Sequence, residues 1–255
     1  MTEGLRALLP ADLPAGQLIG LTDDAPLYWL SEGPVDLELY RRLVVDHAPT
    51  GLWPVIAEAL DHDVRLPWFD PSGLTPESVA AVDSHDPAGV LQAFWAEVVE
   101  DDEESAEALD PFGISFPGLA APGAPTESPE DLAIWLATDE QPLPTSRLLL
   151  TKAARTADLL AVVGWNGPLN HSNEIAPLAA VLRSWEDRFG ARVVKVGFDT
   201  LDVSVAAPPT SEAHALQVAA EHFAFCPDNI DQGAGSLREY AEAIQDANSW
   251  SFWWD

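Results

Sequence analysis

Two residues near the end of the chain have types and spacing that could support chemistry. His222 and Cys226 lie four positions apart, so on a helix they would share one face. An imidazole and a thiol at this spacing could ligate a soft metal ion, or could act as a base and a nucleophile. Two ligands do not complete a metal site, and no second cysteine is present to extend it. The sequence therefore favours a buried structural thiol beside a helix-end histidine, and we expect neither a bound metal nor a cofactor.

A polar stretch follows the cysteine directly. It supplies four candidate binding residues, Asp228, Asn229, Asp231 and Gln232. Positions 228–239 have the length of a calcium-binding loop, with Asp first and Glu last, but Ile230 occupies the third position, where an oxygen ligand is required. The calcium interpretation is therefore rejected. We expect a surface loop here, and an enzyme would use a polar cleft formed by Cys226–Gln232.

The net charge of −30 limits the classes of partner that the chain could bind. Residues 66–146 contain 17 Asp and Glu and no Lys or Arg, and the densest acidic run is Asp101, Asp102, Glu103 and Glu104. Such a run could form a face that docks a basic protein, or it could serve only solubility. Either role argues against direct binding to nucleic acid or to an anionic membrane, because phosphate contacts need clustered Lys and Arg.

The elements that would position these residues follow from apolar periodicity and capping signals. Helices are expected over 35–45, 86–99, 129–138, 175–189, 211–223 and 236–247, and strands over 17–31 (a pair), 147–153, 194–198, 201–205 and 250–254. Residues 54–60 fit a strand or a short helix equally well. In the last strand Trp253 breaks the alternation of the other aromatic residues, so it is the best candidate for an exposed aromatic anchor.

Composition predicts an α+β protein in two parts. Residues 110–130 are rich in Pro and Gly and are typical of a linker or a long surface loop. They would separate an acidic α+β N-terminal region, 1–140, from a C-terminal domain, 145–255, with a small mixed or antiparallel sheet covered by helices. The single cysteine, the lack of a signal-like N-terminus and the lack of a long apolar run predict a cytoplasmic protein without a transmembrane helix.

Four segments in the second half resemble a known bacterial family. They are VLRSWEDRFGARVV, SVAAPP, AAEHFAFCPDNIDQG and SWSFWWD, and they occur in this order. Together they resemble the family called domain of unknown function 4253, over roughly residues 145–255. The family carries no established activity, so the resemblance supports the division into two parts and leaves the function open.

Three functions fit these observations. The first is a non-catalytic acidic module that binds a basic protein, such as an inhibitor or an immunity-type partner. The second is a hydrolase-like enzyme that uses the polar cleft near Cys226–Gln232. The third is a structural or regulatory protein whose charge is only background. We expect the first, because no phosphate loop, nucleophile elbow or dinucleotide-binding motif occurs in the sequence.

Overall fold

A single mixed sheet of seven strands runs through the computed structural model, which describes residues 4–22, 24–60, 67–99 and 107–255. The strand order is β1-β2-β4-β3-β5-β6-β7. The strands are β1 (Gly16–Ile19), β2 (Tyr28–Pro34), β3 (Leu52–Ala57), β4 (Arg147–Lys152), β5 (Arg192–Val196), β6 (Thr200–Ser204) and β7 (Ser249–Trp253). The pair β3–β5 is parallel and the other neighbours are antiparallel. The expected α+β class is confirmed.

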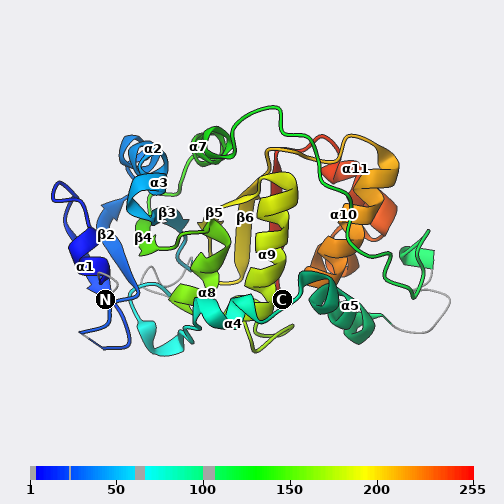
Figure 1. Cartoon of the computed structure of the whole chain (residues 1–255), viewed down its shortest axis with the longest axis horizontal. Coiled ribbons are helices and arrows are strands. Elements are labelled where there is room, and N and C mark those ends of the chain that lie inside the picture. The colour runs from blue at the N-terminus through cyan, green and yellow to red at the C-terminus, as the bar shows by residue number, and fades with distance from the viewer. Residues whose placement is uncertain (1–3, 23, 61–66, 100–106) are drawn as a thin grey trace.

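Helices cover the sheet, and further helices lie beyond its β7 edge (Figure 1). The longer ones are α2 (Leu37–Val45), α5 (Pro87–Val98), α7 (Pro129–Asp139), α9 (Ala176–Phe189), α10 (Glu212–Phe225) and α11 (Leu237–Ile244). The short ones are α1 (Leu5–Leu8), α3 (His47–Thr50), α4 (Val79–Asp83), α8 (Leu159–Val163), the 3₁₀ turns η1 (Pro71–Gly73) and η2 (Thr156–Asp158), and the π-helix η3 (Asn229–Ala234). Helix α2 contacts α7 and strand β3, and helix α7 contacts strands β5 and β6. Helix α8 contacts α9 and β4.

Local signals explain where several helices begin. The Asp36 side chain accepts hydrogen bonds from two amides at the start of α2, and Asp86 does the same for one amide of α5, which has Pro at its first turn. The Ser236 hydroxyl accepts from the Glu239 amide at the start of α11, as the capping-box pattern predicts. The Glu239 carboxylate bonds the Ser236 hydroxyl. These caps satisfy amides that have no partner inside the helix.

Strand β3 lies between two strands from the C-terminal half of the chain. It pairs with β4 along its whole length and with β5 at Ile56 and Ala57. All six residues of β3 are buried, as expected for a strand covered on both faces. The sheet is therefore larger than the small C-terminal sheet that the sequence suggested, because β1, β2 and β3 join it. The division into separately folding parts at 1–140 and 145–255 stays a prediction.

The largest aromatic cluster lies between α9, α10 and β7. The Trp185 ring stacks on Phe252 at a centroid distance of 5.4 Å, and Trp250 packs edge-on against both Trp185 and Phe189. All four side chains are buried. Burying aromatic side chains contributes strongly to stability, and edge-on or stacked geometry adds to it. The final strand is thus docked into the core, as the alternating aromatic residues predicted.

The Pro/Gly-rich segment lies against the C-terminal half. The Glu221 carboxylate, which is fully buried, accepts from the Ala120 amide at 2.6 Å, from the Trp185 indole at 2.8 Å and from the Arg188 guanidinium at 2.6 and 2.8 Å. Further along, the Gly123 amide donates to the Arg188 carbonyl, and a Cβ at Gly123 would lie 2.1 Å from a backbone oxygen. Only glycine fits this close approach, so part of the expected linker is packed in place.

Candidate functional site

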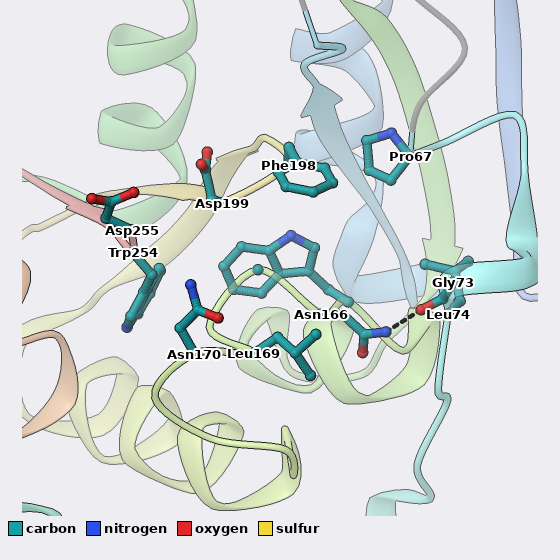
Figure 2. A pocket seen from close by; sticks show the side chains of 12 residues that line it. Pro67, Gly73, Leu74, Asn166, Leu169, Asn170, Phe198, Asp199, Trp254 and Asp255 are labelled. Atoms are coloured by element: carbon teal, nitrogen blue, oxygen red, sulfur yellow. Dashed lines mark hydrogen bonds between the residues drawn. The ribbon is translucent and has the colours of Figure 1, made fainter. Parts of the chain in front are cut away.

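A pocket of about 500 Å³ is formed by segments that are far apart in the sequence (Figure 2). It combines the loop after α8, the turn between β5 and β6, the two residues after β7 and a segment around η1. Its lining residues are Pro67, Gly73, Leu74, Trp165, Asn166, Gly167, Leu169, Asn170, Phe198, Asp199, Trp254 and Asp255. This volume lies in the range of sites that hold a small molecule or part of a partner protein.

The loop after α8 is held in place from both ends. The Trp165 indole donates to the Gly197 carbonyl at 2.9 Å, which ties the loop to the β5–β6 turn. Asn166 accepts from the Thr75 hydroxyl at 2.7 Å and donates to the Gly73 carbonyl, which ties it to the segment around η1. These bonds fix the backbone on two sides of the pocket before any ligand arrives.

Aromatic and aliphatic side chains supply the walls. The Trp165 and Trp254 rings meet edge-on, with centroids 5.5 Å apart, and both are almost fully buried. Phe198 and Leu169 stand at the opening, and about half of each side chain is exposed. The sequence predicted that Phe198 would continue a strand, but β5 ends at Val196 and Phe198 lies on the turn. Exposed apolar side chains gathered at one opening are typical of a contact surface.

Two acidic residues, Asp199 and Asp255, lie at one side of the pocket. The Trp254 amide donates to the Asp199 carbonyl at 3.0 Å, which places Asp255 beside Asp199, and Figure 2 shows both carboxylates at the same end. Within the described part of the chain, neither carboxylate accepts a hydrogen bond or forms an ion pair. Among the described lining residues, none is Lys, Arg or His. The pocket therefore combines apolar walls with a negative end.

His222 and Cys226 are buried and are bonded to different groups. The Cys226 thiol donates to the Trp253 carbonyl at 2.9 Å, and burial raises its pKa to about 12. Nδ1 of His222 lies 3.1 Å from the Tyr240 hydroxyl, and its ring packs against Trp185 and Trp250. Burial, with a smaller effect of nearby Arg188, lowers the pKa of His222 well below its ordinary value. These contacts favour a structural role for both side chains.

The polar stretch after Cys226 forms the π-helix η3, and Asn229 bonds to the outer edge of β7. The Asn229 amide group donates to the Ser251 carbonyl at 2.7 Å, and its oxygen accepts from the Trp253 amide at 3.3 Å. One side chain thus satisfies two backbone groups that a neighbouring strand would otherwise bond. A surface loop was expected at Asn229, whereas the structure buries this residue.

The other candidate residues lie near this edge or outside the described structure. Asp228 accepts from the Gln232 side chain at 2.7 Å and from the Asp255 amide at 3.1 Å. Loss of hydration, with a smaller effect of the nearby Asp228 charge, raises the pKa of Asp231. Trp253 is 37% exposed, but a binding role for it stays a prediction. The acidic run Asp101, Asp102, Glu103 and Glu104 lies outside the described residues.

Sequence reasoning missed the pocket because its parts are unremarkable one at a time. None of the residues Cys226–Gln232, where a cleft was expected, is among the described lining residues. The polar cluster is joined to the pocket by the bond from the Asp255 amide to the Asp228 carboxylate. The available signal was the loop at 164–170, which combines Trp, Asn, Gly and Leu between two helices. Among the described residues, no three His, Cys, Asp or Glu side chains are grouped so that they could hold a metal ion.

We expect thiol reagents to label Cys226 slowly at neutral pH, because a buried thiol with a pKa of about 12 supplies almost no thiolate. Labelling by an aromatic disulfide reagent, followed at pH 7 and pH 9 in native protein and in urea, measures this. The urea-unfolded protein is the control and should react in minutes. Labelling of native protein at the unfolded rate would contradict a structural role and would favour the enzyme hypothesis.

A family model described as domain of unknown function, DUF4253, matches residues 147–255. The match begins at β4 and includes β5, β6 and β7, so it covers the aromatic cluster and most of the pocket. No curated protein and no solved structure matches the chain. The described residues contain no helix with the length and apolar character needed to cross a membrane.

Proposed function

We propose that this chain, which carries a DUF4253 domain at residues 147–255, is a non-catalytic module that binds a basic protein. An inhibitor or an immunity-type protein would act in this way. Its net charge of −30 supplies long-range attraction for such a partner. The pocket supplies a place where a specific contact can form at close range.

The observation that carries the proposal is the unequal exposure of the two signs of charge. At least six of the eight Lys and Arg residues in 147–255 form ion pairs with carboxylates of the same chain. The side chains of Arg183, Arg188, Arg192 and Lys195 are only 11–16% exposed. Several acidic partners remain largely exposed, as Asp83 at 62% and Glu212 at 73% do. In these pairs the basic side chain is the more buried member and several of the acidic side chains stay at the surface.

Lys195 illustrates this arrangement. Its ammonium group lies 3.2 Å from Asp202 and 3.9 Å from Glu58, and it also bonds Glu140. Burial lowers the pKa of Lys195, but the three carboxylates outweigh this effect and raise it overall. The lysine therefore stays charged at neutral pH, and its charge is used inside the molecule. A partner would meet the outer carboxylates instead.

The enzyme hypothesis has weaker support. A pocket with apolar walls and a few polar groups is a common form of active site. Catalysis at neutral pH would need a general base or a nucleophile at the pocket. His222 and Cys226 are both buried in contacts elsewhere, so Asp199 and Asp255 are the acidic lining residues left for the role of base. The third hypothesis, in which the charge is only background, predicts no specific partner and is separated from the first by the binding experiment below.

Replacing Asp101, Asp102, Glu103 and Glu104 with Ser should slow association with the basic partner and flatten its dependence on salt. Steered association reaches on the order of 10⁸–10⁹ M⁻¹s⁻¹ at low salt, and the Debye length falls from about 10 Å at 0.1 M to about 3 Å at 1 M. The partner would be isolated by affinity capture at low salt, identified, purified and tested by surface plasmon resonance between these salt concentrations.

A second quadruple variant controls for net charge. It replaces four exposed acids elsewhere, Asp24, Glu32, Asp139 and Glu242, with Ser, so both variants lose the same charge. Replacing the acidic run should reduce the association rate more than replacing the control set does. Equal effects would show that only overall charge matters. Failure to retain any basic protein at low salt would remove the proposed function and favour the enzyme hypothesis.

A further inference from the structure

We infer that the pocket of Figure 2 binds an arginine side chain of the basic partner, an inference that rests on the proposed function. The guanidinium group would lie at the end occupied by Asp199 and Asp255. The apolar stem of the side chain would lie along the aromatic and aliphatic walls. The pocket would then be the specific part of an interface whose remaining attraction is long-range.

The carboxylates of Asp199 and Asp255 have no partner among the described residues. Across the described residues, Glu221 accepts four hydrogen bonds and Asp228 accepts two, whereas the side chains of Asp199 and Asp255 accept none. Among the described residues at least twelve other carboxylates pair with Lys or Arg, whereas no such pair there involves Asp199 or Asp255. Two unpaired carboxylates at the same end of a pocket can both attract one cation.

The walls of the pocket are of a kind that suits an arginine side chain. Trp165, Trp254 and Phe198 contribute aromatic rings to the same pocket that holds the carboxylates. A guanidinium is planar and weakly hydrated, stacks on aromatic faces and donates two parallel hydrogen bonds to a carboxylate. An ammonium group is a compact, strongly hydrated charge that gains less from such walls. The Asn166 and Asn170 side chains are the only uncharged polar side chains among the described lining residues.

The loops that form the pocket are held in place by contacts within the chain. A Cβ at Gly167 would lie 1.9 Å from the Trp165 ring, so the loop packs directly on its own indole. That indole is bonded to the Gly197 carbonyl, and the Trp254 amide is bonded to the Asp199 carbonyl. A site fixed before binding loses little conformational freedom when the ligand arrives. Leu169 and Phe198 at the opening would exclude water around the charged contact, as the residues that surround interface hot spots do.

Three blocked peptides test the inference directly. They are Ac-Gly-Gly-Arg-Gly-Gly-NH₂, the same peptide with citrulline, which is an uncharged isostere of arginine, and the same peptide with lysine. Each is titrated into ¹⁵N-labelled protein in 0.15 M salt while the indole N–H resonances of Trp165 and Trp254 are followed. We expect saturable shifts from the arginine peptide with a dissociation constant on the order of 1 mM, as suits a single side chain. The lysine and citrulline peptides should bind more weakly.

Asp199→Asn is the matched test of the carboxylate. It preserves the shape of the side chain and should weaken arginine-peptide binding about tenfold, since charged hydrogen bonds are the stronger ones. Asp246→Asn is the control, because Asp246 is exposed, makes no side-chain hydrogen bond among the described residues, and has a positive φ that Asn tolerates. It should change the constant by less than about twofold. Melting curves establish that both variants are folded.

The outcomes separate this inference from the proposed function. Equal binding of the arginine and citrulline peptides, or unchanged binding by Asp199→Asn, would overturn the arginine site. If a purified basic partner still binds with its wild-type affinity to Asp199→Asn combined with Asp255→Asn, the partner exists and the arginine site is wrong. If the peptide binds as expected but no basic partner is retained at low salt, the pocket stands as a cation site and the proposed function fails.

Discussion

Removing residues 250–255 should destabilise the protein by several kcal/mol, out of the roughly 5–15 kcal/mol that stabilises a typical domain. The deletion removes strand β7, which pairs with β6 at five positions, and three buried aromatic side chains. Trp250 contacts Trp185 and Phe189, and Phe252 stacks on Trp185. Losing one large buried aromatic side chain costs about 3–5 kcal/mol, so the truncated protein should unfold at much lower urea concentration. Circular dichroism during urea titration measures the effect.

Two single variants make this prediction specific. Phe252→Ala should cost about 3–5 kcal/mol, because its ring is fully buried among four aromatic neighbours. Trp253→Ala, one position away and 37% exposed, should cost less than about 1 kcal/mol. An unchanged urea curve after truncation would mean that the tail is peripheral to stability, and it would strengthen a binding role for Trp253.

Glu221→Leu should destabilise the protein by about 3–5 kcal/mol, because it removes one partner of a buried ion pair and leaves the other. The Arg188 guanidinium is only 11% exposed and would lose both of its hydrogen bonds to the carboxylate. The Trp185 indole and the Ala120 amide would each lose their acceptor as well. Because Ala120 belongs to the Pro/Gly-rich segment, limited proteolysis within 110–126 should also become faster. Urea denaturation and mass spectrometry of the fragments measure the two effects.

Asp187→Asn is the control for this buried pair. Asp187 bonds Arg155 at 2.6 Å, but its side chain is 66% exposed, and exposed pairs contribute about 0–1 kcal/mol. Its unfolding curve should therefore lie close to that of the wild type. If Glu221→Leu behaved like this control, the carboxylate would not hold the segment in place, and the segment would resemble the free linker that its composition suggests.

Much of the fold could be predicted from the sequence because the relevant signals are local. Helix α9 ends at Phe189, and the next residue, Gly190, has φ +62° and so adopts the conformation that glycine favours after a helix. The alternation of Trp250 and Phe252 predicted a docked strand. The position of β3 could not be predicted in this way, because apolar content indicates burial but does not indicate which strands lie on either side. Its neighbours are set by pairings that span most of the chain.

The site was harder to predict than the fold for a related reason. Pro and Gly at 110–130 suggested a linker, but a backbone without regular hydrogen bonds can equally be held by a buried side chain such as Glu221. Asn229 looked like a loop residue, and only the three-dimensional structure shows it bonded to the edge of β7. Asp199 lies between the expected strands 194–198 and 201–205, and it becomes a pocket residue only when Trp254 and Trp165 are brought beside it.

The place of β3 within the sheet has a consequence for synthesis of the protein on the ribosome. Ala57 pairs with Arg147, 90 residues later (147 − 57), and Ile56 pairs with Lys195, 139 residues later (195 − 56). Ribosomes add about 5–20 residues per second, so an apolar strand would wait roughly 5–18 s for its first neighbour and longer for its second. During that interval its edges are open to other nascent chains. Production of this protein should therefore depend on the supply of chaperones that shield nascent chains, and slower translation at low temperature would lengthen the exposure.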